Sequence, residues 1–299
     1  MRVTQSMISR TVVNNINRNL ERMSKAQEQM STGKVVSRPS DDPTALARIM
    51  VLKSTLNQDE QYTKNMEDAI GWLDTSEGAL NNATANMQRA RELAIYGANG
   101  TLSETDMKAL AAEVDQLIDE MVAIANTSYA GQYIFAGQQT TAPPFIRTGS
   151  AVTYDGNNQE LQWEVSPGVT IAPNVTGTAV FNVDSSSQES QLFAALLELK
   201  TALEDGNPSD LQAVLTALDG QMDNLLNIRA TLGAKSNRLN MAKGRAAEAN
   251  TKQTELLSRL EDVDMAKISM DYAIQSYVYQ AGLATGAKVL QPSLVDYLR

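Results

Sequence analysis

Two adjacent aspartates, Asp41 and Asp42, stand between two prolines in the stretch SRPSDDPTALARIM, residues 37–50. Neighbouring carboxylates could act as an acid–base pair or as oxygen ligands for a divalent cation. Asp262 and Asp264 form a second pair of acids close in sequence. A cation site needs further oxygen ligands, and none is recognisable near Asp41 and Asp42. The use of these acids therefore depends on the elements that carry them.

The composition disfavours catalysis. The chain has 299 residues and contains neither cysteine nor histidine. Without cysteine there is no disulfide framework and no thiol chemistry. Without histidine the chain lacks the commonest general base and metal ligand. We therefore expect no catalytic residue, no metal and no cofactor, and a protein that is not an enzyme.

The charge distribution limits the partners. The formal net charge is −10 and the pI is about 4.7, which argues against binding to nucleic acid. Residues 1–40 are basic, but the helical pattern continues through them, so we assign them to the fold and not to a transit peptide. No run of about 18 apolar residues is present, so we expect no membrane insertion. The N-terminus also lacks the apolar stretch of a cleavable signal peptide.

Apolar residues at alternating spacings of three and four are the dominant pattern, and they predict long amphipathic helices that need partner helices. Such seams start at Ile16, Met66, Leu110 and Leu211. Glycines at 97–100 end one helix, and Ser103 is placed to cap the next. A single helix from about residue 44 to 96 would be about 80 Å long.

Residues 130–185 alternate apolar and polar side chains and contain hairpin turn signals at Asp155-Gly156 and Pro167-Gly168. The predicted fold class is mainly α, a long antiparallel coiled-coil bundle built from both chain ends, with a small β-rich insert at its far tip. We divide the chain as follows: an N-terminal assembly helix and linker at 1–43, helical body at 44–138, β-rich outer insert at 139–186, helical body at 187–262, and a C-terminal assembly helix at 263–299.

This arrangement favours a structural use of the acids. Proline is tolerated in the first helical turn and pushes the preceding residue into the extended conformation that an N-cap needs. Asp42 before Pro43 meets that requirement, and Asp41 adds negative charge near the helix N-terminus. We interpret Asp42, Pro43 and Ser103 as helix caps, and Asp262 and Asp264 as caps or solvated helix faces.

Both chain ends carry apolar residues on segments that should not hold a helix alone in water. They are either frayed ends of a monomer core or segments that fold when subunits pack together. We favour the second reading, because the apolar stripe runs close to both ends. The predicted assembly interface consists of Val12, Ile16, Leu20, Met23, Ile274, Val278, Leu283, Val289, Leu290 and Leu294.

The chain resembles the bacterial flagellin superfamily. The stretches LERMSKAQEQMSTGKVVSRPSDDPTALA, GWLDTSEGALNNATANMQRARELA and ANGTLSETDMKALAAEVDQLIDEM resemble its N-terminal region. LGAKSNRLNMAKGRAAEANTKQTELLSRLEDVDMAK and QAGLATGAKVLQPSLVDYLR resemble its C-terminal region, so both ends match in order. Within the family, YIFAGQQTTAPPF at 133–145 and the tail LVDYLR point to subunits at the junction of hook and filament. A minor filament flagellin is the alternative.

The resemblance implies a structural flagellar subunit outside the cell, exported through the type III apparatus without a cleaved signal peptide. It implies assembly with copies of itself in a ring or helical lattice through the terminal helices. The implied neighbours are a hook-associated protein on the hook side and flagellin on the filament side, with a cytoplasmic export chaperone at the C-terminal part beforehand. A coiled-coil signalling module and a secreted enzyme using carboxylates are more remote readings, because no docking segment or convincing acid pair supports them.

Overall fold

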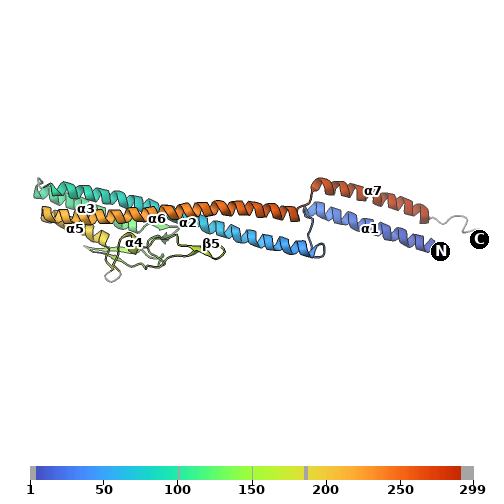
Figure 1. Cartoon of the computed structure of the whole chain (residues 1–299), viewed down its shortest axis with the longest axis horizontal. Helices are drawn as coiled ribbons and strands as arrows, with labels where there is room; N and C mark the ends of the chain where they lie inside the picture. The colour runs from blue at the N-terminus through green and yellow to red at the C-terminus, as the bar shows by residue number, and fades with distance from the viewer. Residues whose placement is uncertain (1–4, 100–101, 150, 185–187, 291–299) are drawn as a thin grey trace, which may run out of the picture. The chain divides into compact units, whose positions relative to one another are not determined.

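The computed structural model describes residues 5–99, 102–149, 151–184 and 188–290 (Figure 1). The chain divides into two compact units. Unit 1 contains residues 1–58 and 248–299, and unit 2 contains residues 59–247. Two long helices, α2 (Pro43–Ala98) and α6 (Pro208–Glu261), contribute residues to both units. The predicted fold class, mainly α with a small β-rich insert, is confirmed.

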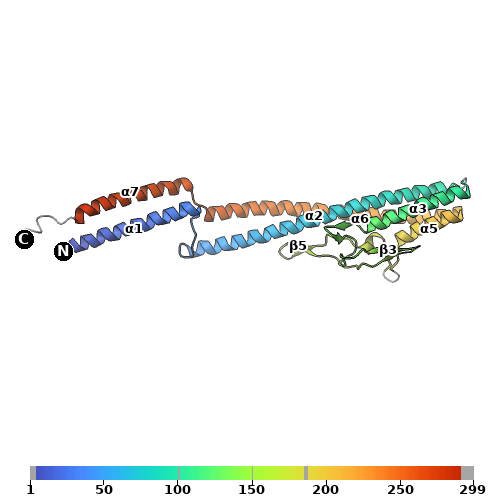
Figure 2. The same cartoon turned by 180° about the vertical axis from the view of Figure 1, so that it is seen from behind.

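Unit 1 is built around a pair of terminal helices, α1 (Gln5–Thr32) and α7 (Met265–Leu290). They lie side by side and run in opposite directions (Figures 1 and 2). The first turns of α2 and the last turns of α6 complete the unit. Its four segments therefore come from the two ends of the chain.

Helix α2 starts at the two aspartates, which have different contacts. Asp42 Oδ1 accepts hydrogen bonds from Thr44 N at 2.9 Å and from Ala45 N at 3.0 Å. These bonds hold the pKa of Asp42 below its ordinary value, and the bond from Ala45 has the largest effect. Asp41 instead accepts a hydrogen bond from Lys25 Nζ at 3.0 Å. Asp42 thus has the geometry of an N-cap, and the two carboxylates do not share a ligand.

A second acid, Glu261, joins the segments of unit 1 at the end of α6. Its Oε1 lies 2.6 Å from Lys34 Nζ and 2.7 Å from Lys53 Nζ, and its side chain is buried. The backbone follows the same connection, since Val35 N donates to Glu261 O and Val263 N donates to Gly33 O. Burial raises the pKa of Glu261, but the hydrogen bonds from both lysines outweigh it, so its pKa is lowered.

Unit 2 packs the remaining parts of α2 and α6 against α3 (Glu104–Ala125) and α5 (Gln191–Asp205). Ser103 caps α3 in a reciprocal capping box with Asp106. Large side chains that are almost fully buried fill the core between these helices: Trp72, Leu80, Met87, Ile118, Met121 and Phe193. The 3–4 spacing places the buried residues of each helix on the side that faces this core.

The β region consists of three separate two-stranded antiparallel sheets. They are β1 (Ser128–Tyr129) with β2 (Gln132–Tyr133), β3 (Phe145–Thr148) with β4 (Ala151–Tyr154), and β5 (Trp163–Ser166) with β6 (Val169–Ile171). A short helix, α4 (Gly177–Val180), follows. The strands begin before the predicted insert boundary at residue 139.

One of the two predicted hairpin turns is wrong. The turn at Pro167-Gly168 joins β5 to β6, and Gly168 has a positive φ of 71°. The turn at Asp155-Gly156 joins no strands, because β4 ends at Tyr154 and β5 begins only at Trp163. The ring of Tyr154 instead packs so close to Gly156 that an added Cβ would lie 2.4 Å from it. A glycine at residue 156 therefore makes room for the tyrosine ring and does not form a hairpin turn.

The insert lies beside the helices of unit 2 and not at their far tip, which corrects the predicted position (Figure 1). Phe145 of β3 and Phe181 contact Phe193 of α5, with ring centroids 5.5 Å and 5.7 Å apart. Arg147 forms ion pairs with Asp115 and with Asp119 of α3. The β region and the helices therefore share one hydrophobic core.

We predict that Asp42→Ala weakens the start of α2. Loss of a side-chain cap should make the amides of Thr44 and Ala45 exchange about five-fold faster in hydrogen-exchange measurements. Because the pKa of Asp42 is lowered, the cap is present above its ordinary pKa and is lost as the pH falls through the lowered value. Exchange that is unchanged in the variant would contradict the capping role.

We predict that Glu261→Gln loosens the connection in unit 1 at neutral pH. Both lysines are about half exposed, so solvent screening keeps the loss small. The pKa of Glu261 is lowered in the folded protein, so its contribution exists above the ordinary carboxyl pKa and disappears as the pH falls through the lowered value. Exchange of the Val35 and Val263 amides should therefore differ between the two proteins at pH 7 and converge in acid. A difference that persists in strong acid would rule out this electrostatic role.

Candidate assembly interface

The terminal helices meet along a seam with 3–4 spacing on each side. On α1 the less exposed positions with this spacing include Val12, Ile16, Asn19, Met23 and Ala26. On α7 they are Ile268, Tyr272, Gln275, Tyr279, Gly282 and Gly286. Such spacing keeps one stripe of an α-helix on its partner over several turns. The two segments therefore form an antiparallel helix pair.

Two glycines let the backbone of α7 approach α1 closely. A Cβ added to Gly286 would lie 2.9 Å from Val12 Cγ1 and 3.5 Å from Ile16 Cδ1. A Cβ added to Gly282 would lie 3.9 Å from Ile16 Cγ1. The sequence signal was visible in GLATG, residues 282–286, since small residues four apart permit close helix packing.

The structure places the predicted interface residues in three groups. Val12, Ile16 and Met23 are partly buried on the seam. Leu20, Ile274, Val278 and Leu283 are exposed, with Leu20 at 43% and Ile274 at 51%. The side chains of Val289 and Leu290, and the whole of Leu294, lie outside the described residues.

Leu20 belongs to the predicted assembly interface but not to the α1–α7 seam, where Asn19 occupies the corresponding position. Spacings of three and four both fit a helix of 3.6 residues per turn, so the pattern after Ile16 allows either residue. The close approach of Gly286 to Val12 and Ile16 fixes the rotation of α1. Leu20 therefore points away from the seam.

Helix α7 carries a second stripe next to its seam. Asp271, Ile274, Val278, Ala281 and Thr285 each immediately precede a seam residue, so they lie about 100° around the helix from it. All five are exposed. Two adjacent stripes with 3–4 spacing are typical of a helix that contacts more than one neighbour.

Apolar burial differs strongly between the two units. Among the described apolar residues, those buried in unit 1 are Ala26, Val36, Ile49 and Ile268, and unit 2 holds all the others. Most exposed large apolar side chains, by contrast, lie in unit 1: Met7, Ile8, Val13, Leu20, Val35, Met50, Val51, Leu256, Met265, Met270, Ile274, Tyr277, Val278 and Leu283. A concentration of exposed apolar residues marks an interaction surface.

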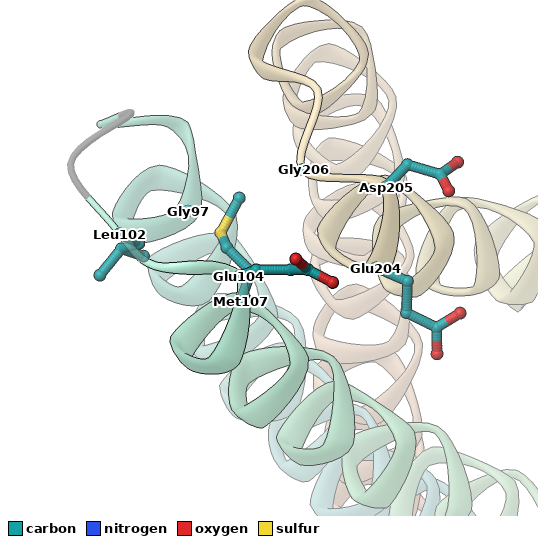
Figure 3. A pocket seen from close by; sticks show the side chains of 7 residues that line it. All are labelled: Gly97, Leu102, Glu104, Met107, Glu204, Asp205 and Gly206. Carbon is teal, nitrogen blue, oxygen red and sulfur yellow. The ribbon is translucent and has the colours of Figure 1, made fainter.

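Unit 2 contains a cavity of about 510 Å³ (Figure 3). Figure 3 shows the carboxylates of Glu104, Glu204 and Asp205 on two facing segments. Glu104 forms an ion pair with Lys108 at 2.6 Å and is largely exposed. Gly206, with a φ of 67°, ends α5 beside it. These acids belong to helix ends, and nothing in the cavity points to a ligand.

The acids first considered for chemistry act as helix caps or lie at helix ends. Asp264 Oδ1 accepts hydrogen bonds from Ala266 N at 3.0 Å and Lys267 N at 3.1 Å at the start of α7. Asp262 accepts a hydrogen bond from Ser258 at the end of α6. Across the described ranges, no group of three or more acids is arranged to hold a metal ion. Within those same ranges, no helix combines the length and apolar character needed to cross a membrane.

Comparison with known proteins identifies both ends of the chain. The family described as "Bacterial flagellin N-terminal helical region" matches residues 3–140. The family described as "Bacterial flagellin C-terminal helical region" matches residues 215–298. A crystal structure of flagellar hook-associated protein 3 from Legionella pneumophila is similar with a TM-score of 0.64 at 19% identity, covering 71% of this chain and 98% of that one. At that identity the likeness concerns the fold.

Curated relatives match nearly the whole chain. Flagellar hook-associated protein 3 of Escherichia coli (strain K12) is 32% identical over 302 residues, covering 94% of this chain and 94% of that protein. The protein of the same name from Salmonella typhimurium is 31% identical over 306 residues, covering 95% of this chain and 96% of that protein. The chain therefore belongs to the bacterial flagellin family, as a relative of flagellar hook-associated protein 3.

Proposed function

We propose that this protein is a structural subunit of the bacterial flagellum that forms the junction between hook and filament. Its terminal helices assemble with those of neighbouring copies as coiled coils. The relatives named flagellar hook-associated protein 3 support the location. The exposed second stripe of α7 is the observation that supports the assembly mechanism.

The stripe needs a partner because of its apolar area. Burying one aliphatic side chain fully contributes about 1.5–3 kcal/mol. Ordering a residue costs about 1–2 kcal/mol in backbone entropy. A single antiparallel pair leaves Leu20, Ile274 and Val278 exposed, so it recovers only part of that cost. Contacts with further copies would bury these residues and stabilise the pair.

The proposed partners follow from this position. Copies of the chain form a ring or helical lattice, a hook-associated protein lies on the hook side, and flagellin lies on the filament side. Before assembly, an export chaperone would cover the exposed apolar residues of the C-terminal part. The protein would then be extracellular, exported without a cleaved signal peptide.

A minor filament flagellin is the second candidate, because the family descriptions that match both ends are those of flagellin. A labelled antibody on isolated flagella distinguishes the two. A thin band at the end of the hook supports the junction subunit. Label along the filament supports a flagellin. Label on neither structure would contradict both.

We predict that Leu20→Asp and Ile274→Asp block assembly onto isolated hooks while the helical circular dichroism stays unchanged. Both side chains are exposed in one chain, so the charge should destabilise only contacts between copies. Leu226→Asp is a matched control, since Leu226 is 47% exposed on α6 in unit 2. If all three variants join hooks like the unchanged protein, the terminal helices are not the assembly surface.

We also predict that Gly286→Ala separates the helix pair. The new Cβ would lie 2.9 Å from Val12 Cγ1, and the branched valine side chain has little freedom in a helix. Gly244→Ala is the control, because a Cβ on Gly244 has no neighbour within 4 Å and alanine favours the helix by about 1 kcal/mol. Hydrogen exchange in α1, which we expect to be faster than in unit 2 already, should become faster still in the first variant only. Equal protection in both would show that the close approach is unimportant.

A further inference from the structure

An apolar groove lies between the first turns of α2 and the last turns of α6. Its volume is about 440 Å³, and it is lined by Ala47, Arg48, Val51, Leu52, Leu256 and Leu260. Val51 is 66% exposed and Leu256 is 48% exposed. All six residues belong to unit 1. Exposed aliphatic side chains on two neighbouring helices form a suitable seat for the apolar face of a third helix.

The groove contains a single charge, which restricts its occupant. Arg48 is exposed and forms no close ion pair among the residues that the structure describes, although its charge is near enough to Asp42 to help lower the pKa of that carboxyl. A helix that lies over Val51 and Leu256 would cover Arg48 as well. Covering a charge is costly unless the arriving helix brings an opposite charge. The occupant should therefore have an apolar face with one carboxylate.

The second stripe of α7 has this composition. Ile274 and Val278 supply exposed apolar side chains, and Asp271 supplies one carboxylate, which has no ion-pair partner within the described ranges. The exposed surface of α1 is less suitable. Its exposed charged residues are Arg10, Arg18, Glu21, Arg22 and Lys25, so it would bring mostly like charges to Arg48.

The residue spacing along α2 at the groove also matches the spacing along the second stripe of α7. On α2, Val51 and Thr55 follow Arg48 by three and seven residues. On α7, Ile274 and Val278 follow Asp271 by the same three and seven residues. Two helices that run in the same direction would therefore bring Asp271 level with Arg48 and Ile274 level with Val51, at 1.5 Å rise per residue.

We propose that α7 of one copy docks into the α2–α6 groove of a neighbouring copy, with Asp271 on Arg48. This inference rests on the proposed function, because it names the surface that receives the second stripe of α7. The contact joins two different surfaces, so it can repeat from copy to copy. The apolar contacts supply affinity, and the ion pair fixes the register.

Exchanging the charges of Arg48 and Asp271 tests whether these two residues lie opposite each other in the docked helices. Arg48→Asp and Asp271→Arg should each reduce binding of the protein to isolated hooks about ten-fold, because each places like charges together. The double variant restores opposite charges and should recover most of the binding. Arg245→Asp, at an exposed position on α6 in unit 2, should bind normally. Single variants that bind normally, or a double variant that stays as weak as the singles, would overturn the proposal.

Cross-linking tests the contact itself, since the chain has no cysteine to interfere. Val51→Cys protein and Ile274→Cys protein are mixed, assembled on hooks and oxidised. A disulfide between the two variants should form faster than between Val51→Cys and Met241→Cys, whose exposed control position lies in unit 2. Equal rates would overturn the proposal. If hooks bind unmodified protein but the two rates are equal, the docking proposal fails while the junction function stands.

Discussion

In unit 1 the described helices present more apolar surface than they bury against one another. The packing of this protein depends on that excess. Helix α7 has a seam against α1 and a second stripe about 100° away that stays exposed among the residues the structure describes. The glycines of the seam increase this difference between the buried seam and the exposed second stripe. Because Gly282 and Gly286 bring α7 close to α1, the pair is narrow and leaves large side chains on its outside. Unit 2 differs, since its helices and strands bury many of their large side chains in one core.

The acidic residues near the ends of the helices serve this architecture. Asp42 and Asp264 cap α2 and α7, so two of the segments of unit 1 start at defined residues. Glu261 holds Lys34 and Lys53 at the place where the two ends of the chain meet. Carboxylates that suggest chemistry in the sequence therefore fix where helices begin and how the chain ends join. This agrees with a structural subunit.

Local signals allowed much of the fold to be predicted from the sequence. Asp42 before Pro43 defines a helix start within a few residues, and α2 begins there. The same kind of reasoning was insufficient for Asp155-Gly156, because the ring of Tyr154, and not the turn preference, decides the backbone path. The approach of Gly286 to Val12 likewise decided between Asn19 and Leu20 on the seam. The contact of Lys34 with Glu261 joins residues far apart in sequence, so no spacing rule could predict it.

Hydrogen exchange before and after assembly tests the central claim most directly. The account predicts that amides of α1 and α7 exchange rapidly in the isolated protein, while amides near Leu80, Met87 and Ile118 in unit 2 are protected. On assembled hooks the terminal helices should become protected by at least about ten-fold, as expected when exposed apolar faces are buried. Strong protection of α1 and α7 already in the isolated protein, with no further change on assembly, would contradict it.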